Sequence, residues 1–310
     1  VERSGANLKL MMTPPEVVKA GNISLDGAEP DFKSAPVIEE AVIRFAKNGL
    51  YGFTLPDEAY KSAVTKWMQM SRKTQIKPEW IVTTLGTIYS LATTIRLVCT
   101  DPDDGIIVTT PVYNRYRQAA DRLNKKTVEC PLLYDSVNGS YQMDFEAIKS
   151  AMANPNNKLF VLCNPHNPVG RVWTKEELET IGDICYRHHV IVVSDEIHAD
   201  FAFQGKHQVF ANLKKEYEEM TIACTSPSKT FNLAGLQTSN IFIPNQKLKN
   251  AFKKQLDAAG YSQLNAAGLV ACEAAYRDGE EWYQTMKKYV AGNIAFTKEF
   301  VEKNLPGVNM

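Results

Sequence analysis

The sequence has no surplus of charge of either sign, no long hydrophobic run and no closely paired cysteines. Its 35 Lys and Arg residues balance 35 Asp and Glu residues, so the formal net charge is zero. Proteins that bind nucleic acids or anionic membranes need a surplus of positive charge on some face, so we expect neither partner. No apolar stretch approaches the roughly 18 residues of a membrane span, and residues 1–9 hold no basic segment followed by an apolar core. Neither membrane insertion nor secretion is therefore expected.

The cysteines are spaced singly, and several lie within short apolar runs. They are Cys99, Cys130, Cys163, Cys185, Cys224 and Cys272. This spacing is typical of small buried side chains in a reducing compartment, and we expect a cytoplasmic protein. The adjacent His188 and His189 point to different sides of a helix or strand, so we expect no metal site.

Short apolar runs that alternate with helical segments predict the fold class. Hydrophobic residues make up 44% and charged residues 23% of the 310 residues, which is typical of a globular protein with a large core or two domains. The runs are Gly105–Thr110, Lys158–Cys163, Val190–Ser194, Met220–Thr225 and Ser239–Ile243. Most of them are apolar at consecutive positions, so both faces of the sheet should be covered. We therefore predict an α/β protein with three layers, built on a doubly wound and mostly parallel sheet.

Capping residues and helical spacing predict the helices between and after these runs. Thr174 and Glu177 form the pattern of a capping box that opens a helix up to about Arg187. Another helix should run from Thr87 to about Val98. A late helix is indicated by apolar residues at helical spacing, namely Trp282, Met286, Val290, Ile294 and Val301. We assign residues 38–245 to the large domain, and residues 1–37 with 246–310 to a smaller α/β domain that is incomplete at its C-terminal end.

Polar residues follow four of the apolar runs. They lie in the segments Pro111–Tyr113, Asn164–Gly170, Asp195–His198 and Ser226–Lys229. In open α/β sheets the ligand site lies at the carboxyl ends of the strands, so these segments should meet at one edge of the sheet. Taken alone, each has an ordinary explanation, such as a turn, a helix cap, a solvated lysine or a packed ring. Together they place an amide, a carboxylate, an amine and an aromatic ring at one site.

These segments resemble the fold-type I pyridoxal-phosphate enzymes of aminotransferase class I/II. The resemblance rests on Asn164-Pro-His-Asn-Pro-Val-Gly170, on Asp195, and on Ser226-Pro-Ser-Lys229, and it extends over most of the chain. The segments Asp195-Glu-Ile-His-Ala-Asp200 and Pro227-Ser-Lys-Thr-Phe-Asn-Leu-Ala-Gly235 are similar to the MalY/PatB branch, the carbon-sulfur lyases of the cystathionine beta-lyase type. The resemblance implies pyridoxal 5'-phosphate as the cofactor.

The resemblance assigns a role to each residue around the ring of that cofactor. Lys229 would form a Schiff base with the aldehyde and, once displaced, would remove the alpha proton of the substrate. Asp195 would keep the pyridine nitrogen protonated, so that the ring can accept electrons. Asn164 and His198 would donate hydrogen bonds to the ring oxygen. Tyr113 would stack on the ring, and we count it with Lys229 and Asp195 as catalytic.

The phosphate of the cofactor needs donors, and two segments can supply them. Gly86, Thr87 and Ile88 lie at the start of a predicted helix, where backbone N–H groups and the helix dipole favour an anion. Ser226 and Ser228 can add hydroxyl groups.

Three features depart from the pattern of the family. Position 237 is Gln where transaminases of the class usually carry a phosphate-binding arginine, and Phe53 stands where the family tends to have Tyr. The chain also stops at Met310, before the family's arginine for the substrate carboxylate. The sequence is therefore either a fragment, which we favour, or that of a protein with a damaged substrate site.

The resemblance implies an enzyme that acts on a small amino acid with a sulfur-linked beta substituent. It would release a thiol, and pyruvate and ammonia would follow. Typical transaminases of the class carry Tyr where this chain has His198, and this favours the lyase. Two alternatives stay open: an aminotransferase, because proton removal is common to both reactions, and a cofactor-binding regulator with little turnover. Because sites of the family are completed across a two-fold interface, we also expect a homodimer.

Overall fold

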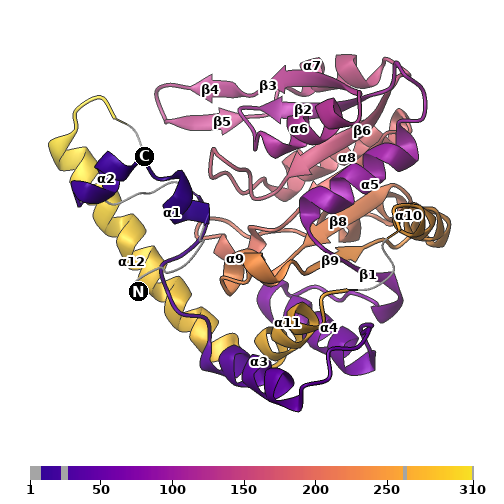
Figure 1. Ribbon diagram of the computed structural model, residues 1–310. Coiled ribbons are helices and arrows are strands. Elements are labelled where there is room, and N and C mark those ends of the chain that lie inside the picture. The colour runs from indigo at the N-terminus through magenta and orange to yellow at the C-terminus, as the bar shows by residue number, and fades with distance from the viewer. Residues whose placement is uncertain (1–7, 22–26, 261–263, 309–310) are drawn as a thin grey trace.

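A seven-stranded sheet lies at the centre of the computed structural model, which describes residues 8–21, 27–260 and 264–308 (Figure 1). In spatial order its strands are β1 (Ile81–Thr84), β9 (Ser239–Phe242), β8 (Thr221–Thr225), β7 (Ile191–Asp195), β6 (Asn157–Cys163), β2 (Gly105–Thr110) and β3 (Lys126–Pro131). All neighbours from β8 to β3 pair in parallel, whereas β9 is antiparallel to both β8 and β1. The predicted strands form within a residue of their expected ends, and the mostly parallel sheet is confirmed.

Helices cover both faces of the sheet, which makes the three predicted layers. On one face lie α5 (Thr87–Val98), α6 (Arg115–Arg122) and α10 (Gln246–Ala258). On the other lie α7 (Phe145–Met152), α8 (Lys175–Arg187), α3 (Pro36–Asn48), α4 (Glu58–Arg72) and α11 (Ala266–Asp278). Within β2, Ile106 and Val108 pack toward the first group, and Ile107 packs toward the second. Consecutive apolar residues are required because both faces of each inner strand are buried.

The predicted helix signals are present in the structure. At the start of α8, the Thr174 hydroxyl accepts a hydrogen bond from Glu177 N at 3.1 Å, and the Glu177 carboxylate accepts one from Thr174 N at 2.8 Å. Both bonds of a capping box satisfy N–H groups that the helix leaves unpaired. The late helix is α12 (Glu280–Asn304), which extends away from the sheet (Figure 1).

Besides five short 3-10 helices, the described residues form several other short elements. They are α1 (Leu8–Met12), α2 (Pro15–Lys19), the hairpin of β4 (Leu133–Asp135) and β5 (Ser140–Gln142), and α9 (Pro227–Thr230). All six cysteines are buried and free, as expected for small core side chains. Within the described residues, no helix is long and apolar enough to span a membrane. The division at residues 38 and 245 stays a prediction.

Candidate functional site

A cavity of about 740 Å³ opens where β7 and β8 end and α5 begins. Nine of the ten predicted site residues line it: Gly86, Thr87, Ile88, Tyr113, Asp195, His198, Ser226, Ser228 and Lys229. They come from separate segments of the chain. The parallel strands bring these segments together because their carboxyl ends share one edge of the sheet.

Lys229 projects from α9, the single helical turn that follows β8. Ser226 fixes this turn, because its hydroxyl donates to Thr238 O at 2.6 Å and accepts from Ser228 N at 3.1 Å. The Lys229 amine donates to Ala28 O at 3.1 Å. Burial lowers the pKa of Lys229, and the negative charges of Glu29 and Asp195 oppose that change in part. A lowered pKa gives more of the neutral amine, which is the form that can act as a nucleophile or base.

Asp195 ends β7 and is 4% exposed. Its Oδ2 accepts a hydrogen bond from the Tyr116 hydroxyl at 2.8 Å, and its Oδ1 accepts one from Ile197 N at 3.2 Å. Burial raises the pKa of Asp195 to about 6, while both hydrogen bonds act in the opposite direction. A carboxylate in such a place is stabilised by a cation, so the site favours a ligand that presents a positive group to Asp195.

Two rings flank the same cavity. Tyr113 is 39% exposed, and its ring meets Tyr116 edge to face at 5.7 Å between centroids. His198 is half-buried, and burial together with the charge of Lys229 lowers its pKa to about 4. The His198 imidazole is therefore neutral at pH 7 and can donate one hydrogen bond and accept another.

The start of α5 offers an anion site. The first N–H groups of an α-helix have no partner within the helix, and the helix dipole makes this end positive. Gly86 precedes the first turn, and a Cβ added there would meet no protein atom within 4 Å. The backbone at Gly86 is therefore open to close approach by a ligand. Ser228 lies across the same cavity and carries a hydroxyl group.

Asn164 is the predicted residue that the structure does not bring to the cavity. Its side chain is buried and donates to Gln208 O at 3.3 Å, while its Oδ1 accepts from Trp173 N at 3.4 Å. Asn167, the second asparagine of the same segment, lines the cavity instead. Both residues stand before proline, so the sequence pattern alone does not distinguish them. Asn167 is therefore the amide that the geometry offers to a ligand.

The structure adds further lining residues and locates two of the departures from the family pattern. Glu29, Tyr116 and Thr238 line the cavity, although the sequence singled out none of them. Tyr116 could have been found, because it lies only three residues after Tyr113, at the start of α6. Gln237 lines the cavity, and the described residues place no arginine on its wall. Phe53 is 91% exposed and does not line this cavity.

The chain is similar to known proteins over most of its length. The family described as aminotransferase class I and II matches residues 19–309. Cystathionine beta-lyase PatB of Bacillus subtilis is 37% identical over 91% of this chain and 73% of its own length. Protein MalY of Escherichia coli is 28% identical over 91% of this chain and 72% of its own length.

Solved structures show the same similarity in three dimensions. Cystalysin from Treponema denticola, which contains pyridoxal 5'-phosphate, superposes with a TM-score of 0.87 at 36% identity, over 92% of this chain and 72% of that one. A C-S lyase from Staphylococcus hominis with bound pyridoxal phosphate gives a TM-score of 0.87 at 31% identity, over 98% of this chain and 77% of that one.

Proposed function

The chain belongs to the aminotransferase class I and II family, and we propose that it is a carbon-sulfur lyase that uses pyridoxal 5'-phosphate. Its small-molecule substrate is an amino acid with sulfur on the beta carbon, and its products are a thiol, pyruvate and ammonia. The named relatives with this activity support the reaction, and the cavity supports the cofactor. The roles of individual residues below are part of the same proposal.

The residues of the cavity fit this cofactor. Pyridoxal phosphate carries an aldehyde, a ring nitrogen that binds a proton, and a phosphate. The cavity offers an amine at Lys229, an acid at Asp195 and a helix N-terminus beside Gly86. Asp195 is buried with a pKa of about 6, so a protonated ring nitrogen would supply the missing positive partner. The single observation that carries the proposal is that Lys229 and Asp195 line one cavity.

When bound, the cofactor supplies an aldehyde that captures amino groups and a ring that accepts electrons. Asp195 would hold a proton on the ring nitrogen of the bound cofactor. The Lys229 amine removes the alpha proton of the substrate, and its lowered pKa leaves it able to do so. Tyr113, Asn167 and His198 line the same cavity, where Tyr113 would pack on the ring of the cofactor and the two polar side chains would offer it hydrogen bonds.

A thiol-release assay tests this function. The purified chain, supplied with pyridoxal phosphate, should release thiol and pyruvate from cystathionine. Lys229→Ala should abolish release because it removes the amine that takes the proton. Lys47→Ala, which removes an exposed charge on α3, should leave release unchanged. Absence of thiol release from a chain that holds the cofactor would overturn the lyase assignment.

The aminotransferase alternative has one specific observation in its favour. Aspartate aminotransferase of Geobacillus stearothermophilus is 27% identical over 91% of this chain. Transfer of an amino group to a keto acid faster than thiol release would establish this alternative. Cofactor binding with neither reaction would indicate the regulator with little turnover.

We also propose that the protein is a homodimer. Apolar side chains are exposed in the segment that leads into α4: Leu50 at 73%, Tyr51 at 68%, Phe53 at 91% and Leu55 at 69%. A cluster of this kind on one segment is typical of a protein contact. Sedimentation should give twice the chain mass, and Phe53→Ser should weaken the dimer, whereas Tyr186→Ser, an exposed residue of α8, should not. A monomer with full activity would contradict this proposal.

The predicted cytoplasmic setting also stays a proposal. Its support is that the six cysteines are free and buried. Proteins in reducing compartments keep their thiols in this form.

A further inference from the structure

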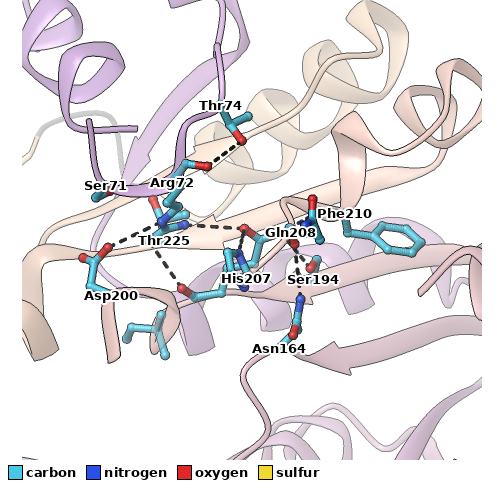
Figure 2. Close-up of polar contacts among 12 residues, drawn as sticks. Ser71, Arg72, Thr74, Asn164, Ser194, Asp200, His207, Gln208, Phe210 and Thr225 are labelled. Atoms are coloured by element: carbon cyan, nitrogen blue, oxygen red, sulfur yellow. Dashed lines mark hydrogen bonds and ion pairs between the residues drawn. The ribbon is translucent and has the colours of Figure 1, made fainter. Parts of the chain in front are cut away.

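Behind the cavity, Arg72 places one buried positive charge between two buried carboxylates. It is the last residue of α4, and its side chain is 1% exposed. Its Nη1 lies 3.4 Å from Glu196 Oε2, its Nη2 donates to Glu196 O at 3.5 Å, and its Nε lies 3.6 Å from Asp200 Oδ1. Figure 2 shows Asp200 on one side of Arg72 and His207 on the other. The side chains of Arg72, Glu196, Asp200 and His207 do not line the cavity.

Glu196 fixes the chain next to Asp195. Its Oε1 accepts hydrogen bonds from Ser194 Oγ at 3.0 Å and from Phe210 N at 3.1 Å, and its Oε2 accepts one from His207 Nε2 at 3.0 Å. The carboxylate is fully buried. Because Asp195 and Glu196 are consecutive, the contacts that hold Glu196 also limit how Asp195 can turn within the cavity.

Asp200 holds the turn that carries Lys229. Its Oδ2 accepts a hydrogen bond from Thr230 Oγ1 at 2.6 Å and another from Trp67 Nε1 at 3.3 Å. Thr230 directly follows Lys229 in α9. The two carboxylates that Arg72 contacts are thus tied to the immediate neighbours of Asp195 and Lys229.

We propose that Arg72 is a positioning residue that sets the spacing between Asp195 and Lys229 by joining Glu196 to Asp200. This inference rests on the proposed function. Asp195 and Lys229 serve opposite ends of one rigid ring, the ring nitrogen and the carbon that bears the aldehyde. Their spacing must therefore match the length of that ring, and rigid support from behind the cavity holds it.

The guanidinium of arginine suits this place. Its Nε lies near Asp200 and its Nη1 near Glu196, whereas lysine offers a single ammonium without this planar fork. Breaking a buried ion pair by removing one partner leaves an uncompensated charge, which is strongly destabilising. The neighbours of Asp195 and Lys229 would then be free to shift relative to each other.

The test compares the wild-type holoenzyme with Arg72→Lys and with Thr230→Val. The second variant removes the Thr230 hydrogen bond to Asp200 and keeps the side-chain shape, so it decides the outcome if Arg72→Lys does not fold. Tyr60→Phe is the matched control, because it removes a buried hydrogen bond at 2.8 Å from the first turn of the same helix, α4, whose last residue is Arg72. Two properties are measured: the rate at which pyridoxal phosphate leaves the holoenzyme, and the circular dichroism of the bound cofactor.

We expect the cofactor to leave Arg72→Lys about tenfold faster or more, and Thr230→Val faster in the same direction. The circular dichroism of the bound cofactor should weaken in both, because it depends on how the ring is held. Tyr60→Phe should lose stability without either change. Wild-type rates and spectra in a folded Arg72→Lys, or in Thr230→Val, would overturn the positioning role. A wild-type chain that binds no pyridoxal phosphate would instead overturn the proposed function.

Discussion

Replacement of Asp195 by asparagine should make the cofactor-free protein more stable at neutral pH. Burial raises the pKa of Asp195 from 3.8 to about 6 in the folded chain. The folded protein therefore binds this proton more tightly than the unfolded chain does. The ionisation of Asp195 has no effect on the free energy of unfolding below pH 3.8. It lowers that free energy progressively as the pH rises from there to about 6, and the loss then stays constant at higher pH.

The size of the effect follows from the difference between the two pKa values. At about 1.4 kcal/mol for each pKa unit, the ionised Asp195 lowers the free energy of unfolding by about 3 kcal/mol at pH 8. An asparagine side chain in its place cannot accept from both Ile197 N and Tyr116 as the carboxylate does, and the weakened hydrogen bond removes about 1 kcal/mol. Asp195→Asn should therefore gain about 2 kcal/mol at pH 8.

Urea unfolding of the cofactor-free chain at pH 8 and pH 5 measures this gain. At pH 5 the penalty from Asp195 is about half as large, so the gain should fall below about 1 kcal/mol. Asp121→Asn, a change at an exposed ion pair with Arg117, should stay within about 0.5 kcal/mol of the wild type at both pH values. A variant that is no more stable at pH 8, or a gain that does not shrink at pH 5, would refute the reasoning.

Three other changes test parts of the site. Tyr116→Phe removes a hydrogen bond to the ionised form of Asp195, so the pKa of Asp195 should rise. The pH below which cofactor affinity falls should therefore rise by about one unit. An unchanged pH dependence of affinity would show that this bond has no such effect. Asn167→Ala should weaken cofactor binding about tenfold in a fluorescence titration. Asn164→Ala should instead lower the free energy of unfolding by about 2 kcal/mol, because it removes two buried hydrogen bonds. The reverse pattern would show that Asn164 is the residue that binds the cofactor. Gly86→Ala places a methyl group where the phosphate approaches, so affinity should fall more for pyridoxal phosphate than for pyridoxal, without loss of stability; equal losses for both ligands would contradict a phosphate site there.

The sequence predicts the sheet and most of the site because these depend on local patterns. Continuous apolar runs are typical of inner strands of a covered sheet, and β2 forms at the expected residues, Gly105–Thr110. The capping residues Thr174 and Glu177 act within one turn, so the start of α8 is also predictable. Once the strands are parallel, the polar residues that follow them must meet at one edge.

Features that depend on tertiary packing could not be predicted. The run that forms β9 has the same apolar character as its neighbours, and nothing in the run indicates that it is antiparallel. Asn164 and Asn167 occupy equivalent places before proline, and only the folded chain shows which one faces the cavity. Arg72 lies among other basic residues in the sequence, and its burial depends on carboxylates more than 120 residues away.

The central claim is that the Lys229 amine binds the aldehyde of pyridoxal phosphate while Asp195 faces its ring nitrogen. Borohydride treatment of the holoenzyme, followed by digestion and mass spectrometry, tests the first half directly. We predict one phosphopyridoxyl group, attached at position 229, and a large loss of affinity for the cofactor in Asp195→Ala. A label on another lysine, or no label on a chain saturated with cofactor, would contradict the account.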